Sequence, residues 1–210
     1  MGNFVQYVYM VTQMVNVRYG KWNEALAYPE VSTNYAFAFV LNKWAKGLAY
    51  ANIGKIKEAK KEQAILHEKL SNADLQIRLE PFNKPYDQAI IAENILLGTI
   101  AQFENKLPEA ITYFTKAVQE EDKLVYTEPR DWLIPTRQYL ANVLIKSKQY
   151  GSAKKYLMED LAINPNNFYS IAALEYISSQ EANSKLQAQY KKQLNAVYTD
   201  SDLPFPALIY

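Results

Sequence analysis

Few side chains in this sequence have the types and spacing that catalysis or metal binding requires. His67 is the only histidine, and the residues at helical spacing from it, Gln63 and Ser71, are poor metal ligands. The acidic cluster at 120–122 could supply a general acid and a general base, but no desolvating aromatic pocket is evident beside it. We therefore interpret His67 and the acidic cluster as exposed surface groups.

The motifs of common catalytic and cofactor sites are also missing from the sequence. The six glycines stand one at a time, so no phosphate-binding loop is formed, and neither G-x-S-x-G nor H-E-x-x-H occurs. No cysteine is present, which excludes disulfides, thiolate metal sites and cysteine nucleophiles. The sequence thus predicts a protein that is not an enzyme and has no cofactor, metal or catalytic residue.

The segment EPRDWLIPTRQYL contains a possible loop site formed by Trp132 and Arg137. Trp132 offers a large rigid surface, and Arg130 and Arg137 can pair with carboxylates of a partner. A structural interpretation is equally concrete: Trp132 plugs a gap between helix pairs, and Asp131 or Glu128 pairs with Arg137. If Trp132 is a plug, Trp132→Ala should lower stability by ~3–5 kcal/mol, whereas unchanged melting would support an exposed binding role.

Composition narrows the possible partners. The 210 residues carry 23 Lys and Arg against 22 Asp and Glu, a net charge of +1, so no basic field is available for nucleic acid. The amino-terminal apolar stretch is interrupted by Gln6, Thr12 and Gln13, so it predicts neither a signal peptide nor a membrane span. We expect a soluble chain, cytoplasmic or periplasmic, and the compartment stays open.

A short phrase recurs four times, as GKWNEAL, GKIKEAK, NKLPEAI and KQYGSAK. Aligned on Ala25, Ala59, Ala110 and Ala153, the phrases are 34, 51 and 43 residues apart. A period of 34 residues is typical of paired-helix repeats, and the longer intervals include proline-rich connectors. Apolar residues three and four apart flank each phrase, so each phrase marks the bend of a helical hairpin.

The pattern predicts an all-α fold in a single domain, 1–210. In the third hairpin we expect close helix approach at Gly98 and Ala110, with Phe114 filling the space between neighbouring hairpins. About five hairpins are expected, at roughly 4–30, 34–71, 86–123, 134–165 and 167–199, followed by a tail at 200–210. Pro29 should break the second helix of the first hairpin.

The two end helices differ in pattern. Near the carboxyl terminus one apolar stripe is backed by a polar face, as a capping helix of a repeat array requires; the stripe is Leu186, Tyr190, Leu194 and Val197. The amino-terminal helix is apolar nearly all round. We expect either upstream repeats or a second copy of the chain to cover it.

These features resemble the tetratricopeptide repeat family. The residues that match its pattern are Gly47, Tyr50, Gly54 and Ala59, then Leu97, Gly98, Ala110, Phe114 and Ala117, then Leu140, Ala141, Ala153, Leu157 and Pro165. The resemblance implies a right-handed superhelix, an α-solenoid. Gln63 departs from the pattern, because an aromatic residue is usual there.

A narrower resemblance covers roughly residues 85–175. This region is similar to the carboxy-terminal part of large bacterial tetratricopeptide proteins, in which E-P-x-D-W-x-x-P-x-R recurs. Matching residues are Glu128, Pro129, Asp131, Trp132, Pro135 and Arg137. The resemblance implies that the chain is the last part of a larger protein.

In this family the concave wall binds partners. The resemblance assigns to that wall the residues Tyr7, Met10, Met14, Trp44, Leu48, Asn52, Ile95, Thr99, Gln102, Gln138, Asn142 and Lys146. The wall lacks the lysine of family members that clamp carboxylate-ended peptides, since Gln138 stands at that position.

The leading hypothesis is a noncatalytic interaction scaffold that binds a peptide or partner domain on the concave face, tested by Trp44→Ala with Asn142→Ala. The alternative is a structural or self-association module, whose wall is filled by the apolar tail or by another copy. Deleting residues 203–210 would separate the two. An enzyme would require a cleft of clustered, perturbed carboxylates.

Overall fold

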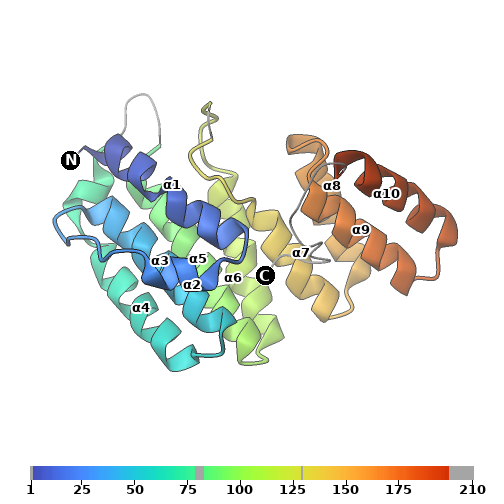
Figure 1. Ribbon diagram of the computed structural model, residues 1–210, viewed down its shortest axis with the longest axis horizontal. Coiled ribbons are helices and arrows are strands. Elements are labelled where there is room, and N and C mark those ends of the chain that lie inside the picture. Colours follow the sequence, from blue (N-terminus) through green and yellow to red (C-terminus); the bar gives the residue numbers. More distant parts are fainter. Residues whose placement is uncertain (1, 79–82, 129, 199–210) are drawn as a thin grey trace. The chain divides into compact units, whose positions relative to one another are not determined.

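The structure, a computed structural model, describes residues 2–78, 83–128 and 130–198, and all regular structure in these ranges is helical (Figure 1). The predicted all-α fold class is therefore confirmed. The helices are α1 (Asn3–Arg18), α2 (Trp22–Ala27), α3 (Ala36–Asn52), α4 (Ile56–Lys69), η1 (Ala73–Gln76), α5 (Pro85–Phe103), α6 (Leu107–Glu121), α7 (Thr136–Lys146), α8 (Tyr150–Ile163), α9 (Phe168–Gln180) and α10 (Ser184–Val197).

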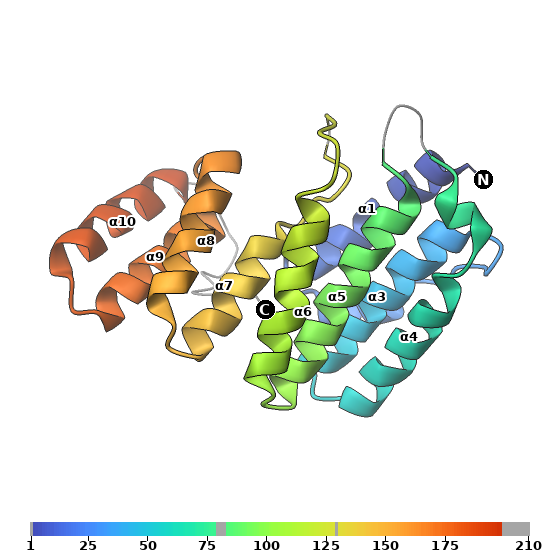
Figure 2. The ribbon, with the colours of Figure 1, turned by 180° about the vertical axis from the view of Figure 1, so that it is seen from behind.

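Within the described residues the helices pack as five adjacent pairs, from α1 with α2 to α9 with α10. Figure 2 shows the pairs from α3 with α4 onward. Each pair extends at most one residue beyond the range that the sequence predicts for it. Helix α2 ends at Ala27, two residues before Pro29, as expected from the missing amide hydrogen of proline. The predicted tail at 200–210 lies outside the described residues.

The chain divides into two compact units, Met1–Ile134 and Pro135–Tyr210. Unit 1 contains α1 to α6, and unit 2 contains α7 to α10. The sequence pattern predicts one continuous domain over 1–210, and that prediction remains a prediction. The two units are described one at a time below.

The turns inside the five pairs share one geometry. In each, the amide hydrogen of the third residue after the first helix bonds to the carbonyl five residues earlier, and the residue before it has a positive φ. This is the Schellman motif, which satisfies the last carbonyls of a helix. The donors are Lys21, Lys55, Lys106, Gln149 and Asn183, and the positive-φ residues are Gly20, Gly54, Asn105, Lys148 and Ala182.

The four recurrent alanines lie in the first turn of the second helix in the first four pairs. Ala25, Ala59, Ala110 and Ala153 are all fully buried, and each amide hydrogen bonds to the carbonyl four residues earlier at 2.9–3.0 Å. A methyl side chain allows the second helix to approach the first closely at the start of each hairpin. The interpretation of the phrases as hairpin bends is confirmed.

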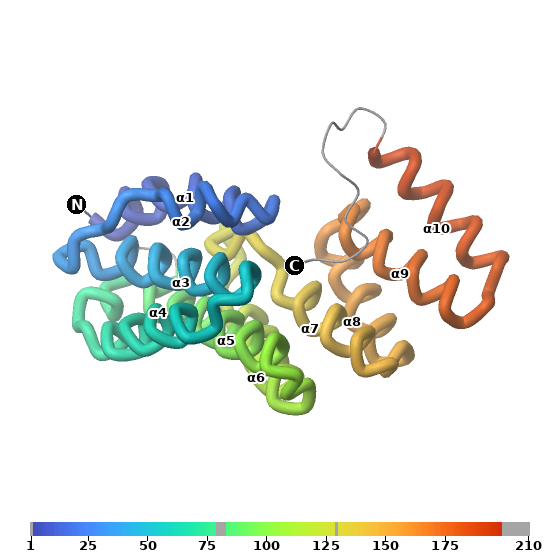
Figure 3. The backbone as a smooth tube through the Cα atoms, turned by 60° about the horizontal axis from the view of Figure 1, so that its bottom comes forward, coloured from blue at the N-terminus to red at the C-terminus, as the bar shows by residue number. Residues whose placement is uncertain are grey.

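Helix α3 is the centre of unit 1 and contacts α1, α2, α4 and α5 (Figure 3). Two glycines allow close approach. A Cβ atom at Gly47 would lie 2.6 Å from Leu96, and one at Gly98 would lie 2.6 Å from the ring of Phe114. Phe114 therefore fills space inside its own hairpin against Gly98, whereas the sequence placed it between neighbouring hairpins.

Unit 2 combines a small apolar core with a buried carboxylate. Helix α9 contacts α7, α8 and α10, and Leu194 of α10 packs with Ile171 and Ala172. The Asp160 carboxylate is buried and accepts hydrogen bonds from Gln138 Nε2 at 3.2 Å, from Asn164 Nδ2 at 2.8 Å and from Ser170 Oγ. A buried charge is stable only when it is hydrogen-bonded in this way. Because the donors come from α7, from the end of α8 and from α9, Asp160 links these three helices.

Candidate partner-binding surfaces

Most of the wall residues predicted in unit 1 are buried in its core. Tyr7, Met10 and Met14 of α1, Trp44 and Leu48 of α3, and Ile95, Thr99 and Gln102 of α5 are all buried, while Asn52 is half-buried. Their helices pack directly, α1 on α3 and α3 on α5. Within the described residues these side chains hold helices together and present little surface to a partner.

The predicted site residues of unit 2 are mostly buried as well, but their known contacts are polar. Gln138 is buried and donates to Asp160, and Arg137 is buried with its Nε 3.3 Å from a carboxylate oxygen of Glu159. Asn142 is also buried, and Lys146 is exposed at the end of α7. The ion pair of Arg137 with Glu159 joins α7 to α8, and the predicted pairing of Arg137 with Asp131 or Glu128 stays a prediction.

The structure brings together two tryptophans that the sequence assigned to separate sites. The rings of Trp44 and Trp132 meet edge to face, with centroids 5.3 Å apart and an interplanar angle of 64°. Both side chains are buried. Edge-to-face packing is a favourable arrangement for aromatic rings, so Trp132 is anchored on α3. We call residues 130–134 the Trp132 segment.

Tyr7 and Asn83 hold the two residues that precede Trp132, Arg130 and Asp131. The Tyr7 hydroxyl donates to the carbonyl of Arg130 at 3.1 Å. The Asn83 amide nitrogen donates to a carboxylate oxygen of Asp131 at 2.7 Å. Burial, and then the negative charge of Asp131, raise the pKa of Tyr7 to about 12.

Asn83 also pairs with both backbone groups of Val125. Its Nδ2 donates to the Val125 carbonyl at 2.9 Å, and its Oδ1 accepts from the Val125 amide at 2.8 Å. No pattern in the sequence points to Asn83, which lies in an irregular connector just before α5. Two-point recognition of the backbone N–H and C=O of one residue by an amide side chain fixes the direction of the backbone that it binds.

A second surface is the outer face of α1. Phe4, Val5, Val8, Tyr9 and Val15 are 41–58 % exposed. The polar residues Gln6, Gln13 and Asn16 of the same helix are buried. The helix thus buries amide and apolar side chains together and also exposes apolar side chains to solvent, where polar residues are usual.

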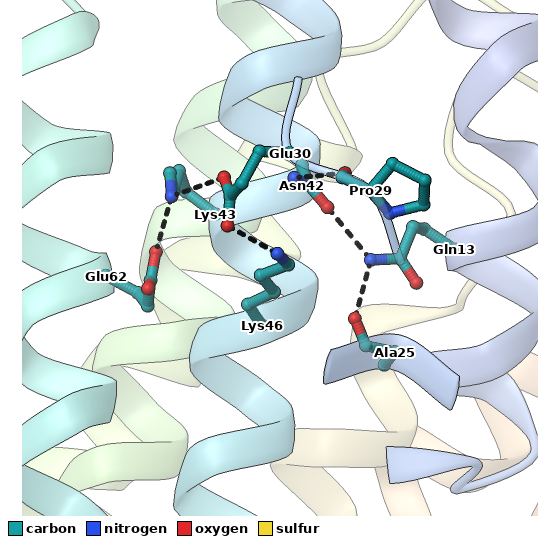
Figure 4. Close-up of polar contacts among 8 residues, drawn as sticks. All are labelled: Gln13, Ala25, Pro29, Glu30, Asn42, Lys43, Lys46 and Glu62. Atoms are coloured by element: carbon teal, nitrogen blue, oxygen red, sulfur yellow. Dashed lines mark hydrogen bonds and ion pairs between the residues drawn. The ribbon is translucent and has the colours of Figure 1, made fainter. Parts of the chain in front are cut away.

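The inward polar residues of α1 are fully engaged. Gln6 Oε1 accepts hydrogen bonds from the amides of Phe37 and Ala38 at 3.0 and 3.1 Å, and so caps the start of α3. Gln13 Nε2 donates to Asn42 Oδ1 at 2.9 Å and to the Ala25 carbonyl at 3.1 Å (Figure 4). These bonds fix the orientation of α1, so its apolar face points outward.

An ion-pair network ties the connector after α2 to α3 (Figure 4). Glu30 pairs with Lys43 at 3.0 Å and with Lys46, and Lys43 also pairs with Glu62 of α4 at 3.2 Å. The hydrogen bond from Lys46 lowers the pKa of Glu30, with a further contribution from Lys43. Burial opposes protonation of Lys43, but Glu30 and Glu62 outweigh it and its pKa is raised.

His67 and Glu120 of the acidic cluster each lie beside an ionisable side chain in the structure. His67 is exposed, and its Nδ1 lies 2.6 Å from Glu93 of α5, a partner that local spacing could not reveal. Glu120 pairs with Lys123 at 2.7 Å on the surface. In the part of the chain that the structure describes, no three or more His, Cys, Asp or Glu side chains cluster as metal ligands would.

No helix within the described ranges has the length and apolar character that crossing a bilayer demands. A comparison of the chain with protein-family models, with curated proteins and with solved structures finds no match.

Proposed function

We propose that this chain is a noncatalytic protein-interaction module built from tetratricopeptide-type hairpins. Three features support the proposal: the paired helices, the recurrent Schellman turns, and the buried alanine at the start of each of four second helices. Repeated hairpins of this kind stack through nearest neighbours and leave their end surfaces for further packing. Superhelical stacking of all five pairs is part of this proposal.

The observation that carries the proposal is the apolar outer face of α1. Five large apolar side chains are exposed on one helix, and no charged residue occurs in α1 before Arg18. Exposed apolar clusters on a helix are typical of protein–protein contact sites. Hydrogen bonds to α2 and α3 prevent the helix from turning this face inward.

The occupant that we propose for this face is a second copy of the chain. An uncharged apolar stripe is complementary to itself, so two copies can pack α1 against α1 about a two-fold axis without like-charge repulsion. Burial of these side chains would be driven by the hydrophobic effect. The chain would then act as a self-associating module, one of the two functions that the sequence leaves open.

Sedimentation over a range of concentrations tests this proposal. We expect the full chain to be a dimer, and Val8→Glu to convert it to a monomer because it places a charge in the middle of the contact. The matched control is Ala188→Glu, on the exposed face of α10, which should leave the dimer intact. A wild-type chain that stays monomeric, or a Val8→Glu variant that stays dimeric, would contradict the proposed interface.

Binding of a separate peptide to the predicted wall is the second candidate. Burial of Trp44 and Asn142 means that replacing both by alanine would change stability as well as binding. The observation in favour of this candidate is the way in which unit 1 holds the Trp132 segment. A variant without residues 203–210 tests the tail, since partner capture and oligomer size should both be unchanged if the tail does not take part.

A further inference from the structure

The Trp132 segment contacts unit 1 as an extended peptide ligand contacts a receptor. Three groups hold it, and they come from three places in the sequence: Tyr7 of α1, Trp44 of α3 and Asn83 before α5. Two of these contacts are directed at groups that any peptide has or can have, a main-chain carbonyl and a carboxylate. Only the third, with the indole, requires a tryptophan.

We propose that the Trp132 segment is a resident self-ligand, and that unit 1 has a binding site for peptides containing the dipeptide Asp-Trp. The site consists of Tyr7, Trp44 and Asn83. A peptide of another protein that contains Asp-Trp would replace the resident segment and make the same three contacts. This inference rests on the proposal that the chain binds protein segments, but not on the α1 dimer.

The geometry specifies which peptide fits. Counting from the tryptophan, the carbonyl two residues before it accepts from Tyr7, and the acidic side chain one residue before it accepts from Asn83. The indole packs edge to face on Trp44. Asn83 adds a two-point contact to the backbone of Val125, so the same amide fixes both a carboxylate and a peptide unit. These contacts select sequence and backbone direction together.

Buried polar groups at the site have no hydrogen-bond partner among the described residues while the Trp132 segment occupies it, which favours replacement of that segment by a peptide. The indole nitrogens of Trp44 and Trp132 are buried without a hydrogen-bond partner in the described part of the chain. Buried polar groups without partners destabilise the state that contains them. A peptide that supplies an acceptor to one of these donors would recover that loss.

Space for additional peptide groups lies beside the segment. A hollow of about 100 Å³ is lined by residues from 121 to 132, among them Tyr126, Arg130 and Trp132. Tyr126 and Val125 are well exposed at its edge. Part of the wall of this hollow is the resident segment itself, so the hollow adjoins the tryptophan position and would change shape when a peptide takes the place of that segment.

A purely structural plug makes a different prediction. A segment that is simply part of the folded core would keep its position in the native state, so a free peptide would not bind. A self-ligand can be supplied in trans, and the tethered copy should compete with it because a short tether gives a high effective concentration. Removing the tethered tryptophan should therefore expose the site to a free peptide.

The experiment uses the full chain with Trp132→Ala and a synthetic peptide of the sequence VYTEPRDWLIP. We expect saturable binding to the variant, an increase in its melting temperature, and affinity at least about tenfold above that for the wild-type chain, in which the resident segment competes. The control peptide, with alanine in place of the tryptophan, should not bind. Absence of binding to a folded variant, or equal binding of both peptides, would overturn the proposal.

A second pair of variants gives the answer should Trp132→Ala not fold. Asp131→Ala removes only the contact with Asn83, so the resident segment should be easier to replace and the peptide should bind more tightly than to wild type. Tyr7→Phe added to Asp131→Ala removes the donor to the carbonyl and should weaken binding again by several fold. Equal affinity of the peptide for wild type and Asp131→Ala would contradict a self-ligand.

The same measurements in a Val8→Glu background separate this inference from the α1 dimer. If Val8→Glu leaves the sedimentation of the chain unchanged but the peptide still binds the Trp132→Ala variant, the dimer is wrong and the self-ligand is supported. If Val8→Glu yields monomers and the peptide does not bind, the dimer is supported and the self-ligand is wrong.

Discussion

Helices α1 and α10 are attached to their units in opposite ways. Helix α10 has one fully enclosed apolar anchor, Leu194, and its remaining surface is mostly polar and exposed. Helix α1 buries Gln6, Gln13 and Asn16 beside its methionines and exposes an apolar face. Hydrophobic burial thus orients α10, whereas directed hydrogen bonds orient α1.

The difference shows how a helix can have an apolar surface facing solvent. A helix held only by the hydrophobic effect would rotate until its apolar face was buried, as α10 has done. Gln6 and Gln13 bond to specific atoms of α3 and α2, which fixes the rotation of α1. The outward apolar face is compatible with this anchoring, and it is the surface that a second copy would cover.

The largest effect should come from the α10 anchor. Leu194→Ala removes the side chain that packs with Ile171 and Ala172, so we expect a loss of about 2–5 kcal/mol in the free energy of unfolding. Urea unfolding followed by circular dichroism would measure it. Val197→Ala on the same helix, where the side chain is 38 % exposed, should change stability much less. Equal losses would show that α10 is not anchored through Leu194.

The corresponding change in α1 is Gln6→Met, which keeps the size of the side chain and removes its oxygen. The amides of Phe37 and Ala38 would lose their acceptor, and a buried unsatisfied donor costs about 1–3 kcal/mol. Hydrogen exchange at these two amides should accelerate along with the loss of stability. Gln189→Met, at an exposed position of α10, serves as the control and should be near neutral.

The turns of the two terminal pairs allow a matched comparison. Gly20 and Ala182 occupy equivalent turn positions with φ of 63° and 54°, a region that favours glycine. Ala182→Gly should stabilise the chain and Gly20→Ala should destabilise it, each by about 0.5–1 kcal/mol. Thermal unfolding of both variants would measure the changes. Shifts of the same sign would mean that the two turns are not equivalent.

The smallest effect concerns the ion pairs that hold the connector after α2. The lowered pKa of Glu30 contributes stability that is present at neutral pH and is lost as pH falls through the acid range. The raised pKa of Lys43 contributes stability that is lost only as pH rises through the strongly basic range. Because Glu30 is well exposed, Glu30→Gln should lower stability at pH 7 by no more than about 1 kcal/mol.

That difference should disappear at low pH, where the wild-type carboxylate is protonated as well. Chemical denaturation of both proteins over the acid range would measure it. A constant difference between wild type and Glu30→Gln from neutral to acid pH would show that the charge of Glu30 is not the source.

The sequence was sufficient to predict the helices and their pairing, because these features depend on local signals. The period of the alanines and the residues of the turns identify each hairpin within about forty residues of sequence. The fifth turn was harder to detect, since Ala182 provides the positive φ where glycine or asparagine is usual.

The contacts of the candidate site depend on residues far apart in the sequence and could not be predicted. Tyr7 and Arg130 are 123 positions apart, and Asn83 and Asp131 are 48 apart. The family positions identified Tyr7 and Trp44 but treated them as open surface. Only the packing of the connector shows that Trp132 covers Trp44, and only the direction of the Gln6 side chain shows which face of α1 is outward.

The shared Schellman geometry has a consequence for how such a protein can grow or shrink. Each hairpin is closed by hydrogen bonds between residues no more than five positions apart. A gene segment that encodes one hairpin therefore also encodes all the residues that close its turn. A tandem duplication of one pair would bring a ready-made turn, and only the new helix-to-helix surfaces would need to adapt. Changes in repeat number are therefore an accessible route of variation for this architecture.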